Sequence, residues 1–132
     1  MPRVLWPLRH DQPSIQIVLR LVASGQDVIR HLLADTGAGT NRSGFELLLP
    51  ETDCLQARGA AGRRVHLSGA YQGSFPLYLV RVQIPALGFV LHVRTVGVPS
   101  APPGMDGVAA FCFLNRFSYG NFGDPGQFGL EV

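Results

Sequence analysis

The chain has 132 residues and a mass of 14.3 kDa, which is the size of one domain. Of its residues, 46% are hydrophobic and 15% are charged, a composition that is typical of globular proteins and excludes a disordered chain. Its net charge is +2, and all eleven basic residues are arginines that are scattered singly apart from Arg63-Arg64, so no basic stripe predicts nucleic-acid binding. No apolar run reaches the roughly 18 residues of a membrane span, and the apolar core of Met1–Arg9 is too short for a secretory signal.

Sixteen glycines and ten prolines separate short apolar runs, which is typical of an all-β domain with many turns. The first predicted strand is 15–21, which is rich in β-branched residues. A hairpin turn at 23–26 is expected to lead into a second strand, 27–34, that ends at Asp35. After a glycine-rich segment, 45–49 is a further predicted strand.

The region 56–73 contains four spaced glycines and is predicted to be a flexible hairpin with the small residues Gly59–Gly62 at its tip. Two longer strands, 75–84 and 87–96, are expected to follow on either side of a Pro-Ala pair. The segment 111–117 is the only predicted helix.

A carboxylate on a tight glycine turn is the most informative feature of the sequence. Asp35-Thr36-Gly37 follows an apolar strand, and it occurs once. Chemistry that uses a pair of carboxyl groups needs two of them about 3 Å apart. A single copy therefore predicts that the chain either works as a symmetric dimer or does not perform this chemistry.

Three features resemble the retropepsin-like aspartic proteases, the single-domain relatives of the pepsins. Leu32–Ala38 looks like the family's apolar-apolar-x-Asp-Thr/Ser-Gly-Ala signature. The first glycine of the segment Arg58–Arg63 lies 24 residues after Asp35, about where the family has its flap. Asp106–Phe117 is similar to the family's late apolar-apolar-Gly segment, which is followed by a short helix with Phe-Leu. Together they cover roughly residues 15–132.

The resemblance implies an all-β fold, a small closed β-barrel of the retropepsin type with one short C-terminal helix. It also implies an aspartic endopeptidase that acts as a homodimer on an extended polypeptide. Asp35 of each copy would be catalytic: the ionised carboxyl takes a proton from a bound water, and the neutral one donates to the scissile carbonyl. Thr36, Gly37 and Ala38 would support the active-site loop. The flap residues implied are Gly59, Ala60, Ala61 and Gly62.

Two positions depart from the family pattern. Gly39 stands where the family often has Ser or Thr, whose hydroxyl bonds the outer oxygen of the catalytic carboxylate, and Ala110 stands where Gly is usual. Two alternatives therefore stay open. One is a catalytically inactive retropepsin-fold module that dimerises or binds peptides, and the other is an unrelated β-barrel binding domain with Asp35 in a plain turn.

Residues 1–14 form a predicted N-terminal arm, a candidate dimer-interface strand that pairs between subunits with the chain end at 127–132, and 15–132 form the protease domain. Cys54 and Cys112 lie 58 residues apart, which is not the spacing of metal ligands, and the histidines are dispersed. No metal, cofactor, nucleic acid or membrane span is expected. Cys112 is predicted to be a buried hydrophobe, and unpaired cysteines favour a reducing, cytoplasmic compartment.

Overall fold

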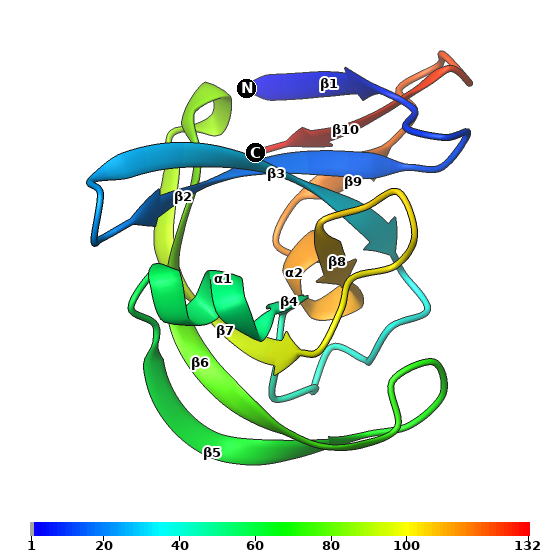
Figure 1. The fold of residues 1–132 in the computed structure, drawn as a ribbon. Coiled ribbons are helices and arrows are strands. Elements are labelled where there is room, and N and C mark those ends of the chain that lie inside the picture. Colours follow the sequence, from blue (N-terminus) through cyan, green and yellow to red (C-terminus); the bar gives the residue numbers. More distant parts are fainter. Residues whose placement is uncertain (1) are drawn as a thin grey trace.

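The computed structural model describes residues 2–132 as a mostly β structure built around a barrel (Figure 1). Six strands close the barrel in the order β2-β3-β8-β4-β7-β6, because β6 also pairs with β2 where Val18 meets Gln83. A seventh strand, β5, continues the sheet beyond β6. The bounds of these strands are β2 Ser14–Leu21, β3 Gln26–Asp35, β4 Leu47–Pro50, β5 Ala60–Leu67, β6 Gly73–Ile84, β7 Phe89–Val98 and β8 Gly107–Ala110.

The hairpin of β2 and β3 follows from alternation in the sequence. Ile15, Ile17 and Leu19 alternate with more exposed residues, and all three are fully buried inside the barrel. Gly25, with a φ of 68°, closes the turn between the two strands. The predicted strands at 15–21 and 27–34 are therefore confirmed. β2 begins one residue earlier than predicted, and β3 is one residue longer at each end.

The strands β5, β6 and β7 form a meander whose turns differ from those predicted. The chain turns from β5 into β6 through 68–72, not at Gly59–Gly62. Between β6 and β7 a 3₁₀ turn, η1 (Pro85–Leu87), ends at Gly88 with a φ of 63°. Because this turn uses Pro85–Leu87, β7 begins and ends two residues later than the predicted strand 87–96.

The short strand β8 lies between β3 and β4, parallel to β3 and antiparallel to β4. A methyl group on Gly107 would lie 2.5 Å from the carbonyl oxygen of Leu48, so only glycine permits this close approach.

The prediction of one helix was wrong. Helix α2 (Phe111–Leu114) follows β8 but ends three residues early, and a second helix, α1 (Glu51–Gln56), follows β4.

A second sheet packs across one end of the barrel and joins the two chain termini (Figure 1). Its order is β1-β10-β9, with bounds β1 Arg3–Pro7, β9 Ser118–Gly120 and β10 Gln127–Glu131. Trp6 and Leu130 point from this sheet into the barrel core. The N-terminal arm thus pairs with the C-terminal strand of the same chain. Both edges of β10 are occupied, which leaves β1 and β9 as the edges of this sheet.

The two cysteines are free and differ in their surroundings. Cys54 on α1 is fully buried, and burial raises the pKa of its thiol to about 12, which leaves it protonated and unreactive at neutral pH. Cys112 is only partly buried, so its predicted burial was wrong.

Among residues 2–132, no helix has the length and apolar character needed to cross a membrane.

Candidate functional site

Asp35 is the last residue of β3, and its carboxylate is half-buried at the mouth of a turn. The backbone N–H of Gly37 donates to Asp35 Oδ1 at 3.0 Å, and the N–H of Ala38 donates to the Asp35 carbonyl at 3.1 Å. A methyl group on Gly37 would lie 3.3 Å from Asp35 Oδ1, so glycine leaves room for the carboxylate. Asp35 and Gly37 therefore form a compact turn, with Thr36 exposed between them.

The loop after Asp35 is fixed by the strand and helix beside it. Asp35 pairs with Ala110 across the parallel strands β3 and β8. The N–H of Phe111, where α2 begins, donates to the Ala38 carbonyl at 2.9 Å. Ala110 is fully buried in extended backbone, with φ −80° and ψ 169°, so its methyl group is accommodated within the core. These contacts place the Asp35 carboxylate on a supported turn.

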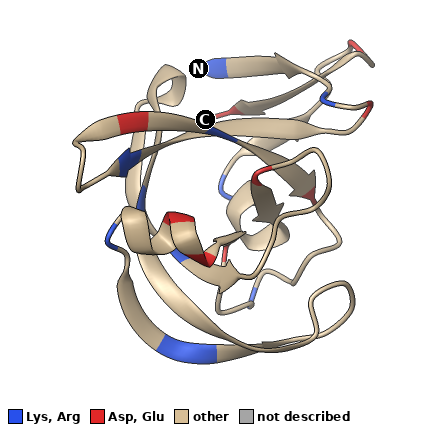
Figure 2. Cartoon of the chain, in the orientation of Figure 1, with Lys and Arg blue, Asp and Glu red and all other residues tan. Residues whose placement is uncertain are grey.

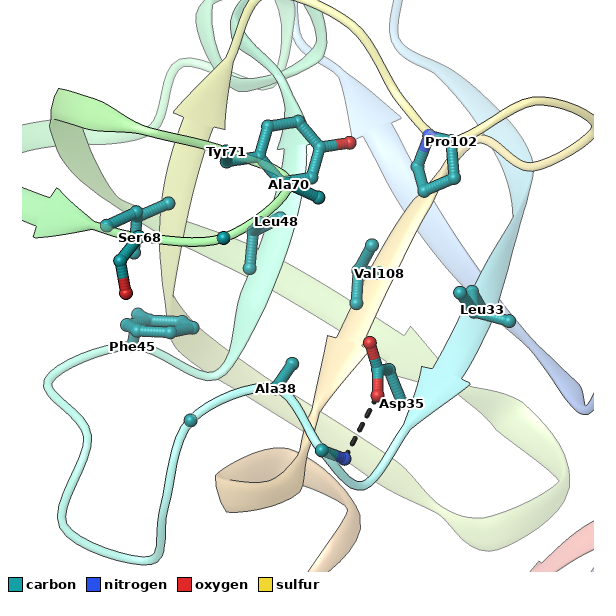
Figure 3. A pocket seen from close by; sticks show the side chains of 14 residues that line it. Leu33, Asp35, Ala38, Phe45, Leu48, Ser68, Ala70, Tyr71, Pro102 and Val108 are labelled. Carbon is teal, nitrogen blue, oxygen red and sulfur yellow. Dashed lines mark hydrogen bonds between the residues drawn. The ribbon is translucent and has the colours of Figure 1, made fainter.

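A pocket of about 480 Å³ opens beside Asp35 (Figure 3). Leu33 and Asp35 reach it because alternate residues of β3 face away from the core. The opposite wall is the tip of the β5–β6 hairpin, and the loop after β7 contributes Pro102. Its lining is Leu33, Asp35, Gly37, Ala38, Gly39, Phe45, Leu48, Leu67, Ser68, Gly69, Ala70, Tyr71, Pro102 and Val108. The pocket is thus an apolar space with one carboxylate in its wall.

The hairpin beside this pocket differs from the one predicted at 56–73, because residues 68–72 form its tip and Gly59–Gly62 do not. Gly69, with a φ of 84°, lies in the tip beside Ser68 and Ala70. Gly59, Ala60, Ala61 and Gly62 lie at the far end of the hairpin, where β5 begins. A methyl group on Gly59 would lie 2.9 Å from Val80 Cγ2, so this glycine serves close packing. The signal for the true tip was the Ser-Gly-Ala-Tyr run at 68–71.

Tyr71 ties the hairpin tip to the loop on the other side of the pocket. Its hydroxyl donates to the carbonyl of Ser100 at 2.9 Å. The ring is partly buried, and burial raises the pKa of the phenol, so the hydroxyl stays protonated and able to donate at neutral pH. This bond holds the tip in place over the pocket.

Removing the Tyr71 hydroxyl is expected to loosen the tip. A lost hydrogen bond costs about 0.5–1.5 kcal/mol, so Tyr71→Phe should speed hydrogen exchange about fivefold at the paired strand ends beside the tip, 65–67 and 73–75. Tyr119→Phe is the control, because the Tyr119 hydroxyl makes no hydrogen bond within residues 2–132. Equal exchange in the two variants would show that the bond does not hold the hairpin.

The backbone conformation at position 39 explains why glycine stands there, where retropepsin-like proteases often have Ser or Thr. Its φ of 74° is a left-handed conformation, and a side chain there would approach Ser43 Oγ to 2.6 Å. Ser43 Oγ instead accepts from the N–H of Thr40 at 2.7 Å. Position 39 therefore cannot carry a hydroxyl without strain, and within residues 2–132 the Gly37 N–H is the only donor to the Asp35 carboxylate.

Residues 2–132 hold no group of three or more His, Cys, Asp or Glu side chains placed to bind a metal ion. Comparisons with known proteins give no match: no family model, no curated protein and no solved structure matches this chain.

Proposed function

We propose that this chain is an aspartic endopeptidase that acts as a homodimer on extended polypeptides. The observation that carries the proposal is a half-buried Asp35 carboxylate held on a supported turn, in the wall of an apolar pocket beneath a hairpin. One chain supplies one such carboxyl group. A second copy related by a two-fold axis would supply the other, and the interface would then be the same surface on both copies.

The chemistry of the pair follows from placing two carboxyl groups in contact. Both cannot ionise at that distance, so the pair retains one proton. The ionised Asp35 would take a proton from a water held between the two copies as that water attacks the peptide carbonyl carbon. The neutral Asp35 would donate its proton to the carbonyl oxygen, which gives a gem-diol. In a second step the carboxylate that lost its proton would take one from a gem-diol hydroxyl, the other Asp35 would protonate the amide nitrogen, and the C–N bond would break to give the acid and the amine. A mildly acidic pH should favour activity, since one member must keep its proton.

The neighbouring residues have roles in this proposal that match their positions. Exposed Thr36 lies beside Asp35, where its hydroxyl is available to the second copy. The hairpin tip at 68–72, in place of Gly59–Gly62, would cover the bound peptide and exclude water. Main-chain groups of the tip would pair with an extended substrate as an added strand.

The dimer requirement predicts how the rate depends on protein concentration. Well below the dissociation constant of the dimer, halving the protein concentration should lower the rate of peptide cleavage about fourfold, because two copies form one site. Sedimentation equilibrium on the same samples should give a dissociation constant that accounts for the loss. A constant specific activity in samples that sediment as monomer would contradict the proposal.

One observation favours a second candidate, an inactive module of the same fold that binds peptides. The Asp35 carboxylate receives a hydrogen bond from Gly37 N–H alone within residues 2–132, and Gly39 supplies no hydroxyl. In that case the wild-type dimer would bind peptides without cleaving any of them between about pH 3 and about pH 7.

A further inference from the structure

The charges of the chain are distributed unevenly over the barrel. Residues 54–105 contain five of the eleven arginines and none of the nine acidic residues. This segment includes β5, β6 and β7, along which Figure 2 shows blue and no red. The segment that carries the hairpin over the pocket therefore has five positive charges of its own, of which Arg94 lies beside the Glu46 carboxylate.

Most arginines of this segment have a partner within the chain. Arg64 donates to the hydroxyl and carbonyl of Ser74 at 3.1 and 2.6 Å. Arg94 lies 3.6 Å from the carboxylate of Glu46. Arg63, the neighbour of Arg64 in sequence, is exposed and forms no hydrogen bond or ion pair within residues 2–132.

Arg63 lies over the loop that forms one end of the pocket. A methyl group on Gly44 would lie 2.9 Å from Arg63 Nη2, so the guanidinium packs against the Gly44 backbone, where no side chain intervenes. The next residue, Phe45, lines the pocket together with Ser68. In Figure 3 these two side chains lie on the side of the pocket away from Asp35 and Leu33. The pocket thus has a carboxylate on one side and an unpaired guanidinium beyond the other.

We propose that Arg63 binds an acidic side chain of the extended peptide, at a position beyond the apolar residue that fills the pocket. This inference rests on the proposed function, since it needs a peptide that lies along the pocket past Phe45. A guanidinium presents a planar pair of donors that matches a carboxylate. The positive charge of β5–β7 adds attraction for acidic peptides over a longer range. The preferred substrate is therefore an apolar segment flanked by Asp or Glu.

The test measures peptide binding in the Asp35→Asn chain, so that cleavage does not consume the probe. The probes are fluorescein-labelled decapeptides with an apolar centre and Glu, Gln or Lys at each flanking position, followed by fluorescence anisotropy. At one flanking position Glu should bind about three- to fivefold more tightly than Gln, and this ratio should fall as salt rises. Arg63→Gln should remove the preference, and Arg63→Glu should transfer it to Lys. Arg64→Gln, the matched control, should keep it.

Three results would overturn the assignment: equal affinity for Glu and Gln peptides, no peptide binding, or the same loss in Arg64→Gln as in Arg63→Gln. Arg63-dependent binding of single-stranded RNA or anionic vesicles in place of the peptides would also overturn it. A Glu preference that depends on Arg63, in a wild-type chain that cleaves none of these peptides, would support this assignment and contradict the protease. Cleavage of these peptides with no Glu preference would support the protease and contradict the Arg63 assignment.

Discussion

Replacing Asp35 with asparagine is expected to lower peptide hydrolysis by at least about 10³-fold while leaving the fold and the dimer intact. Asparagine has the same shape, and its amide oxygen can still accept from the Gly37 N–H that now donates to Asp35 Oδ1 at 3.0 Å. It cannot accept the proton of the attacking water. Cleavage of a peptide library, read by mass spectrometry, measures the loss, and circular dichroism with sedimentation measures the fold and the dimer.

Asp124 offers a matched control for this variant. Its carboxylate accepts from the N–H of Gly126 at 2.8 Å, the same two-residue turn that Asp35 makes with Gly37, in an exposed loop between β9 and β10. Asp124→Asn should therefore cleave the library at the wild-type rate. Unchanged cleavage by Asp35→Asn, or an equal loss in both variants, would contradict a catalytic role for Asp35.

Replacing Arg116 with alanine is expected to destabilise the protein by about 2–4 kcal/mol. Arg116 donates from Nε and Nη2 to the two oxygens of Glu46 at 3.0 and 2.6 Å, and the Glu46 side chain is only 3% exposed. This hydrogen bonding raises the pKa of Arg116. Removing the guanidinium leaves a buried carboxylate without its main partner. The expected loss of stability is smaller than the largest losses known for buried ion pairs, because the Arg116 side chain is 36% exposed.

The second arginine near Glu46 is the control for this prediction. Arg94 approaches Glu46 Oε1 only to 3.6 Å and is 50% exposed, so Arg94→Ala should cost less than about 1 kcal/mol. Urea unfolding of both variants measures the difference. Because Glu46 accepts the N–H of Ala110 with its backbone carbonyl, Arg116→Ala should also weaken the support of the Asp35 turn. Equal stability of the two variants would contradict this account of the pair.

Local patterns in the sequence predicted much of the barrel. The alternation at 15–21 and the apolar run at 27–34 predicted β2 and β3, because one face of each strand is buried. The same signal failed for β8, which is buried on both sides between β3 and β4 and has only four residues. Helix α1 was missed because its pattern is short. Pro50 at its N-cap and acidic Glu51 and Asp53 in the first turn were the available signals.

The site was predicted in part. The strand-to-turn pattern around Asp35 is local, so its position at the end of β3 followed from the sequence. The hairpin tip was misplaced because Gly59 and Gly69 look alike as residues. Only Gly69 has a positive φ, whereas Gly59 is needed where β5 packs on Tyr78 and Val80. The contact between Arg63 and Gly44 could not be predicted from local patterns, because it joins segments that are distant in sequence.

A crystal structure of the assembled protein would show whether the two Asp35 carboxylates form a pair, since it measures the distance between them. An aspartic protease dimer requires one Asp35 from each copy at the two-fold axis, with carboxylate oxygens about 3 Å apart and a water between them. A monomer under all conditions, or a dimer in which the two Asp35 side chains lie apart, would contradict it.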